Sequence, residues 1–352
     1  MSLFEERLAG LPLVVDDYDL HGHQLDVSSD FTRQSTVIAL RGGGEEGRGE
    51  DVTYDPPDQE ALQAAGAVQP LAGEWTLGSF CAHVEGLDLW PEPAAREASE
   101  QYRLWAYESA ALDLALRQAG TSLAARLERE PRPVTFVVSM RLGEPSSLEP
   151  VARLLANYPD LRFKLDAVAD WDDGLVAELV DSEAVDSLDL KGLYSGSPVD
   201  NAADPELYRR VAEAFPDAWI EDPLLNEETD PVLEPYRDRI TWDAPIHSWA
   251  DVEALPFMPR CLNCKPSRFG TLARLCEFYD RCGEAGIALY GGGQFELGVG
   301  RGQIQALASL FHADASNDVA PGGYNAREPR GGLETSPLEP SLAPFGFRRE
   351  LS

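Results

Sequence analysis

Lysine is almost absent from this chain of 352 residues, which contains 26 Arg but only three Lys, namely Lys164, Lys191 and Lys265. Arg can replace Lys wherever only a positive charge is needed, but a guanidinium keeps its proton at every working pH. A buried Lys can instead be tuned to exchange a proton with a substrate. The three retained lysines are therefore candidates for proton transfer. The alternative is chance survival in surface salt bridges.

Three carboxylates stand close to these lysines in the sequence, each at the end of a strand-like segment: Asp189, Glu221 and Asp243. Alternate residues of a strand share a face, so Asp189 shares one with Lys191, and Lys164 shares one with Asp166. If these faces point inward, the three carboxylates offer the oxygen ligands that Mg²⁺ prefers, with Mn²⁺ as a substitute. For any single carboxylate, a helix cap or a salt bridge is the alternative. The regular spacing of three, together with the lysines, favours a joint site.

From Pro131 onward, short β-rich segments alternate with amphipathic helices. Successive strands begin roughly 20 to 30 residues apart, which is one βα unit per step, and seven or eight such units close a parallel barrel. A doubly wound open sheet is the alternative, but no glycine-rich phosphate loop follows the first strand. The predicted strands are Val134–Ser139, Arg162–Asp166, Ser187–Leu190, Ala218–Glu221, Arg239–Asp243, Arg260–Lys265 and Ile287–Tyr290. The helices between them include Leu148–Asn157, Pro205–Ala214 and Thr271–Ala285.

The N-terminal part of the chain has a different pattern. Gln24–Val27 and Ser35–Leu40 are strand-like, Arg41–Gly44 is turn-like, and residues 94–129 repeat apolar residues at helical spacing. We therefore predict an α+β domain over residues 1–128, a barrel over 129–325, and a tail over 326–352 that packs back on the first domain. Disorder is the alternative for the tail.

Several segments together resemble the enolase superfamily, and within it the muconate-lactonizing, mandelate racemase and o-succinylbenzoate synthase-like branch. The resemblance runs from about Leu25 to Asn325. It rests on Lys164-x-Asp166, Asp189, Asp243, Trp219-Ile220-Glu221-Asp222-Pro223, Lys265-Pro266-Ser267-Arg268-Phe269-Gly270, Gly291-Gly292-Gly293-Gln294-Phe295-Glu296-Leu297-Gly298 and Gly47-Arg48-Gly49-Glu50.

The resemblance implies a (β/α)₇β barrel, an α+β capping domain built from both chain ends, and Mg²⁺. It implies that Asp189, Glu221 and Asp243 bind the metal and that Lys265 is an acid/base. The implied first step is abstraction of a proton α to a carboxylate, with the metal stabilising the enediolate. It also places Glu296 near the substrate, although a loop or capping role is the alternative. Arg141 follows the first strand and could clamp a substrate carboxylate or form a surface salt bridge.

Two positions depart from this branch. Strand two usually carries Lys-x-Lys, and Asp166 replaces the second lysine; strand three usually carries Asp-x-Asn, and Lys191 replaces the asparagine. A single base suffices for syn elimination or cycloisomerisation, so the change favours a lyase, a dehydratase or another β-elimination enzyme, acting on a small carboxylate. The second hypothesis is a racemase or epimerase with a Lys191–Lys265 pair, or a cycloisomerase. A non-catalytic binding protein on the same fold is the third.

The charge excludes some partners. With 61 Asp and Glu against 29 Lys and Arg, the formal net charge is −32, and no basic stripe is visible. Such a surface repels phosphate, so we expect neither a nucleic-acid nor a membrane partner. No apolar run reaches the length of a membrane helix, and the N-terminus lacks the pattern of a signal peptide. We therefore expect a cytoplasmic homo-oligomer with a small carboxylate substrate. The acidity indicates either a salt-rich cytoplasm or simple solubility.

Overall fold

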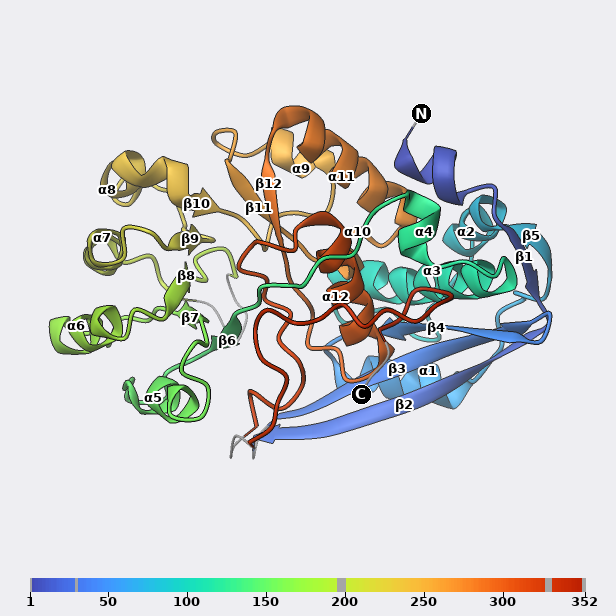
Figure 1. Cartoon of the computed structure of the whole chain (residues 1–352), viewed down its shortest axis with the longest axis horizontal. Helices are drawn as coiled ribbons and strands as arrows, with labels where there is room; N and C mark the ends of the chain where they lie inside the picture. Colours follow the sequence, from blue (N-terminus) through green and yellow to red (C-terminus); the bar gives the residue numbers. More distant parts are fainter. Residues whose placement is uncertain (1, 29–30, 195–200, 327–330, 350–352) are drawn as a thin grey trace.

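The computed structural model describes residues 2–28, 31–194, 201–326 and 331–349. Of the predicted tail, residues 327–330 and 350–352 lie outside this part of the chain. Two units lie side by side in Figure 1: an antiparallel sheet with helices, and a set of parallel strands surrounded by helices. The mixed α/β architecture predicted from the sequence is confirmed.

The first unit is built on a three-stranded antiparallel sheet in the order β2-β3-β4. Its strands and helices are η1 (Phe4–Leu8), β1 (Pro12–Val15), β2 (Asp17–Ser28), β3 (Phe31–Gly42), β4 (Glu45–Asp51), α1 (Pro56–Ala65), β5 (Gly73–Thr76), α2 (Leu77–Glu85), α3 (Ala98–Gln118) and α4 (Leu123–Leu127). A second, two-stranded sheet pairs β1 with β5.

Strand β4 lies directly on helix α3, and two glycines make this possible. A Cβ atom at Gly47 would come within 2.3 Å of the Ala110 carbonyl oxygen, and one at Gly49 within 2.0 Å of the Ala106 carbonyl oxygen. Such distances are far shorter than any van der Waals contact, so larger side chains would force the strand off the helix. The Gly-x-Gly spacing thus fixes how the capping sheet sits on its main helix.

The second unit begins with five parallel strands in the order β10-β9-β8-β7-β6, and β11 pairs with β12. Its elements are β6 (Val138–Met140), α5 (Glu149–Leu155), β7 (Phe163–Asp166), α6 (Asp173–Asp181), β8 (Val185–Asp189), α7 (Pro205–Ala214), β9 (Trp219–Glu221), α8 (Asp230–Leu233), η2 (Glu234–Arg239), β10 (Ile240–Thr241), α9 (Trp249–Glu253), β11 (Cys261–Cys264), α10 (Pro266–Phe269), α11 (Leu272–Ala285), β12 (Ala288–Gly291) and α12 (Val299–Phe311).

Backbone contacts outside these strands close the ring. The Asn263 N–H donates to the Trp242 carbonyl at 3.1 Å, which joins β11 to the residue that follows β10. Two isolated parallel bridges, Gly292 with Asp318 and Phe136 with Asn317, then connect β12 to the segment that precedes β6. Residues 317–318 therefore act as a short eighth strand, and the arrangement is the (β/α)₇β barrel that the family resemblance implies.

The predicted barrel strands agree with those of the structure to within a few residues. In the capping unit, β2 begins at Asp17, well before the predicted Gln24, and two further predictions are corrected. The turn predicted at Arg41–Gly44 is shorter, because β3 continues through Gly42 and only Gly43 and Gly44 adopt positive φ angles of 59° and 82°. The helix predicted over residues 94–129 is interrupted between α3 and α4. There, the Leu123 N–H donates to the carbonyl of Gly346 in the C-terminal tail, which competes with continuous helix.

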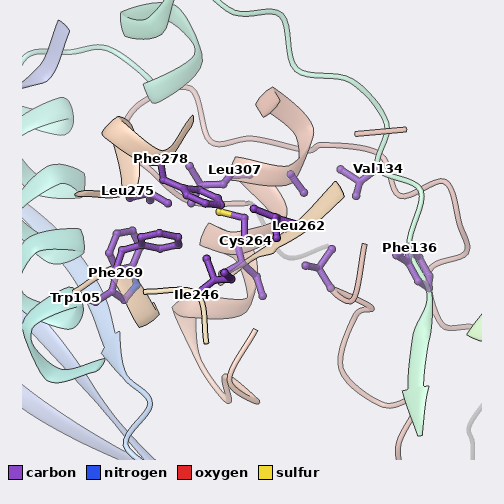
Figure 2. Packing of buried hydrophobic residues seen from close by; sticks show 14 of the residues in the cluster. Trp105, Val134, Phe136, Ile246, Leu262, Cys264, Phe269, Leu275, Phe278 and Leu307 are labelled. Carbon is purple, nitrogen blue, oxygen red and sulfur yellow. The ribbon is translucent and has the colours of Figure 1, made fainter. Parts of the chain in front are cut away.

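A single apolar core joins the two units. Trp105 from α3 belongs to the same buried cluster as Phe269 of α10 and Leu275 and Phe278 of α11, and Figure 2 shows these side chains gathered together. The rings of Phe269 and Phe278 lie 4.7 Å apart. This shared core holds the capping unit against the carboxyl ends of the strands. Among the described helices, none is both long and apolar enough to cross a membrane.

Candidate active site

The register of the parallel strands brings the predicted polar residues to one level of the barrel. Asp166 at the end of β7 is paired with Asp189 at the end of β8, and Asp189 is paired with Glu221 at the end of β9. Lys164 lies two residues before Asp166 on the same face of β7, and its side chain is almost fully buried. The carboxyl ends of barrel strands are where such folds place their chemistry.

Three carboxylates form a compact buried cluster in this layer. Oxygen atoms of Asp189, Glu221 and Asp222 all lie within 4.8 Å of one another. Asp222 was not among the predicted ligands, because strand alternation points it away from Glu221. Its positive φ of 49° breaks that alternation, and its carboxylate accepts the N–H groups of Asp243 and Ala244 at 2.8 and 2.9 Å.

Asp243, the third predicted metal ligand, is engaged differently. Its Oδ2 accepts from Lys265 Nζ at 2.6 Å and from the Tyr194 hydroxyl at 3.1 Å, and its Oδ1 lies 3.1 Å from Arg268. The Arg268 and Lys265 cations thus hold this carboxylate, and they keep the pKa of Asp243 far below its usual range despite complete burial. The structure therefore groups Asp189 and Glu221 with Asp222, next to an Asp243–Lys265 pair.

The other two lysines contact the carboxylate cluster itself. Lys164 donates to Glu221 and forms an ion pair with Asp189 at 3.2 Å. Lys191 donates to Asp189, and its Nζ lies 3.7 Å from Asp166. All three lysines of the chain consequently meet carboxylates at this end of the barrel.

Burial and neighbouring charges shift the ionisation of these groups strongly. Burial alone lowers the pKa of a lysine, but the surrounding carboxylates outweigh it and raise the pKa of both Lys164 and Lys191. Burial and the nearby Asp189, Asp243 and Asp222 raise the pKa of Glu221, against the opposing effect of Lys164. Burial likewise raises the pKa of Asp222 to about 6. Despite complete burial, Lys191 and Lys164 lower the pKa of Asp189, so Glu221 and Asp222 are the members of the cluster whose negative charge is least compensated.

This donor set fits a hard divalent cation. Carboxylate oxygens are the ligands that Mg²⁺ and Mn²⁺ take in proteins, and here three of them converge in a buried position. Burial is the main cause of the raised pKa of Glu221, and the neighbouring carboxylates add to it; a bound cation would favour the charged form of this side chain.

The predicted substrate-binding residues lie in different places. Asp166 accepts from Arg141 Nε at 3.0 Å, so these two form a pair at the edge of the lysine cluster. Glu296 turns toward helix α12: its Oε1 accepts from the Gln294 N–H at 2.6 Å, and its Oε2 lies 3.1 Å from Arg301. Arg141 and Asp166 therefore border the site, whereas Glu296 contacts the loop after β12 and Arg301 of α12.

Sequence reasoning missed several residues that complete the site. The Tyr290 hydroxyl from β12 donates to Glu221. Asn263 lies two residues before Lys265 on β11, is 2% exposed, and has neither amide atom hydrogen-bonded within the described chain. A Cβ at Gly292 would lie 2.7 Å from both Asn263 Oδ1 and Lys265 Cε, so the amide stands beside the lysine stem. Asn263 could have been predicted from the sequence, because it lies two residues before Lys265 and alternate residues of a strand share a face.

Comparisons with known proteins agree with this geometry. Two family models match the chain, the domain of unknown function (DUF8230) N-terminal domain over residues 6–126 and its C-terminal domain over residues 130–326. No curated protein matches the sequence.

Solved structures of the enolase superfamily are similar in fold. A dipeptide epimerase from Methylococcus capsulatus, complexed with a Mg ion, is 19% identical, with 87% of this chain and 90% of that chain covered and a TM-score of 0.65. An unknown member of the enolase superfamily from Enterococcus faecalis V583 is 20% identical, with 88% and 86% covered and a TM-score of 0.63. A muconate cycloisomerase from Pseudomonas fluorescens is 18% identical, with 88% and 87% covered and a TM-score of 0.61.

The resemblance predicted from the strand-end motifs is thereby confirmed at the level of the fold. The chain belongs to the DUF8230 family, and it has the fold of the enolase superfamily.

Proposed function

We propose that this protein is an enzyme that removes a proton from the carbon next to a carboxylate group of a small substrate. The observation that carries the proposal is the meeting of all three lysines of the chain with buried carboxylates at the carboxyl ends of β7, β8 and β11. A chain that otherwise uses Arg for its cations retains Lys only here, where an amine that exchanges a proton has a use.

Asp189 and Glu221, with Asp222 or Asp243 as the third ligand, would hold Mg²⁺ or Mn²⁺. A bound divalent cation supplies positive charge where negative charge builds up on a substrate carboxylate. The dipeptide epimerase of similar fold was crystallised with a Mg ion, which supports the same metal here.

The lysines differ in their suitability for proton transfer. Lys164 and Lys191 each contact the carboxylate cluster, which raises the pKa of both amines, so in this arrangement they carry charge. They are suited to attract an anionic substrate or to donate a proton. Among the carboxylates of the described residues, Lys265 forms an ion pair with Asp243 alone, and Asp243 is also paired with Arg268. We therefore assign the base to Lys265.

Two reaction types fit this chemistry. Elimination needs one base, and Asp166 in place of a lysine on β7 favours it, as the sequence predicts. Racemisation or epimerisation needs an amine on each side of the substrate carbon. One observation favours this second type: Lys191, on the β7–β8 side, and Lys265, beyond β11, approach the carboxylates from different strands. The structures of similar fold include a dipeptide epimerase and a muconate cycloisomerase, which are isomerases.

The test is solvent deuterium exchange at the α-carbon, followed by NMR on a panel of acid sugars, dipeptides and succinylbenzoate-like acids with Mg²⁺. Exchange of one enantiomer with release of water or another leaving group indicates a lyase, and exchange of both enantiomers indicates a racemase or epimerase. If no acid of the panel exchanges, and Mg²⁺ fails to raise the melting temperature, the binding-protein hypothesis replaces this proposal. The homo-oligomeric state and the cytoplasmic location stay predictions.

A further inference from the structure

A cavity outside the strand-end site has an unusual lining. It has a volume of about 600 Å³ and lies between the capping sheet, the start of α12 and the C-terminal tail. Figure 1 shows the C-terminal end of the chain beside α12 and the capping sheet. Six of its lining residues are cationic or titratable bases: His21, His23, Arg48, Arg301, Arg348 and Arg349.

The absence of carboxylates from this lining is the informative feature. In the whole chain, Asp and Glu outnumber Lys and Arg by 61 to 29. No Asp or Glu is among the described residues that line the cavity. The rest of the wall is glycine and apolar side chains, namely Val37, Leu297 and Val299. A pocket lined by basic and apolar side chains is thus unusual on so acidic a protein, although each of its four arginines, Arg301 with Glu296 included, is paired with a carboxylate outside the lining.

Carboxylates outside the lining hold the arginines in place. Arg48 Nε donates to Glu46 at 2.6 Å, Arg348 Nε lies 2.5 Å from Asp113, and Arg349 binds Glu334 through both Nη atoms. Each guanidinium carries five N–H donors in a fixed fork. Within the described part of the chain, Arg48 donates through Nε and Arg348 through Nε and Nη2, so other N–H groups of these two side chains can meet a ligand. The pocket is therefore preorganised, which lowers the entropic cost of binding.

The N-terminus of α12 helps to shape the cavity, but its positive dipole end is already compensated by a carboxylate. Its N–H groups at Leu297, Gly298 and Gly300 donate to the buried Glu50 carboxylate. A Cβ at Gly298 would lie 3.3 Å from His23 Nε2, so glycine lets the imidazole approach the start of α12. The cations that face the cavity, and not the helix dipole, are what an anion would meet.

We propose that this cavity binds a multivalent organic anion, with phosphate or carboxylate groups at the arginines and a carbon body against Val37, Leu297 and Val299. Paired Arg side chains recognise both groups in a bidentate manner. The size of the cavity suits a metabolite rather than a single inorganic ion. The site is separate from the lysine cluster and does not depend on the reaction proposed above.

The experiment is calorimetric titration of the full chain with pyrophosphate and, separately, with citrate, in Mg²⁺-free buffer at about 0.15 M NaCl to screen the surface charge. We expect one equivalent to bind at millimolar concentration or tighter. Arg48→Gln should weaken binding about tenfold or more, the usual effect of losing a charged hydrogen bond. Arg41→Gln is the matched control, because Arg41 lies on the same sheet, is similarly exposed and pairs with Asp17 and Asp19.

His23→Gln gives a second, independent variant, since His23 is exposed and its loss leaves the core intact. A preference for pyrophosphate or for citrate assigns the ligand to the phosphate or the carboxylate class. The proposal fails if neither anion binds, if Arg41→Gln weakens binding as much as Arg48→Gln, or if both Arg48→Gln and His23→Gln bind as the wild type does.

Discussion

Glu108 provides a measurable link between pH and the docking of the two units. It lies in α3 of the capping unit, is fully buried, and accepts the N–H of Leu272 at 2.7 Å at the start of α11. Its other oxygen has no hydrogen-bond partner within the described chain. Burial raises the pKa of Glu108 to about 8, despite the opposing bond from Leu272. We therefore expect Glu108 to be protonated when the protein is folded at neutral pH.

The magnitude follows from linkage. Between the usual pKa of 4.5 and the raised value of about 8, the folded state holds a proton that the unfolded state has released. The free energy of unfolding therefore falls as pH rises, by about 1.4 kcal/mol per pH unit. The accumulated loss is about 3 kcal/mol at pH 7 and approaches 5 kcal/mol above pH 9, a large share of a typical domain stability.

Glu108→Gln keeps the shape and removes the titration. The variant should match the wild type near pH 4.5 and exceed it increasingly up to about pH 8, in urea unfolding followed by circular dichroism. Glu100→Gln is the control, because it removes a negative charge from an exposed position of the same helix. If the difference between Glu108→Gln and wild type is constant from pH 5 to pH 9, Glu108 ionises normally and the reasoning is wrong.

Three further predictions concern single side chains. Lys265→Arg should fold and bind Mg²⁺ but lose about three orders of magnitude in kcat, since guanidinium cannot accept a proton; an enzyme that keeps a tenth of its activity would remove Lys265 from the base role. Asn263→Leu should unfold at equal or higher urea, because two unpaired polar atoms leave the interior, and should raise KM if Asn263 contacts substrate. Burial lowers the pKa of His312 to about 4, so the wild type should lose about 3 kcal/mol as pH falls from 6.5 to 4, and His312→Gln should lack this loss in thermal scans.

Much of the fold follows from local patterns. Strands such as β8 and β9 are predicted because short buried runs between amphipathic helices have few other conformations. The eighth strand could not be predicted, because two bridges at Asn317 and Asp318 are too short to leave a period in the sequence.

The candidate site also has a part that the sequence predicts and a part that it does not. The position of Asp189 and Glu221 at strand ends predicted that they share a site. The same pattern gave no signal for Asp222, because a period of two residues does not detect a left-handed φ. Arg268 is a partner of Asp243, and its position is set by α10, the short helix after β11. Motif spacing thus predicts which residues lie at the carboxyl ends of the barrel strands, but it does not predict which of them form ion pairs with one another.

The pairing of Lys191 with Asp189 leads to a last prediction, because that amine and a metal ion would compete for one carboxylate. At an effective dielectric constant of about 20, unit charges about 4 Å apart interact by about 4 kcal/mol. Even a third of this energy would make Lys191→Asn bind Mg²⁺ about tenfold more tightly. The measurement is the Mg²⁺ concentration needed to raise the melting temperature, which requires no substrate. Lys265→Gln removes one of the two cations that hold Asp243 and leaves Arg268 in place. An equal gain in that variant would make Asp243 the third ligand, and no gain would favour Asp222. An unchanged Mg²⁺ dependence in Lys191→Asn would show that Asp189 does not bind the ion.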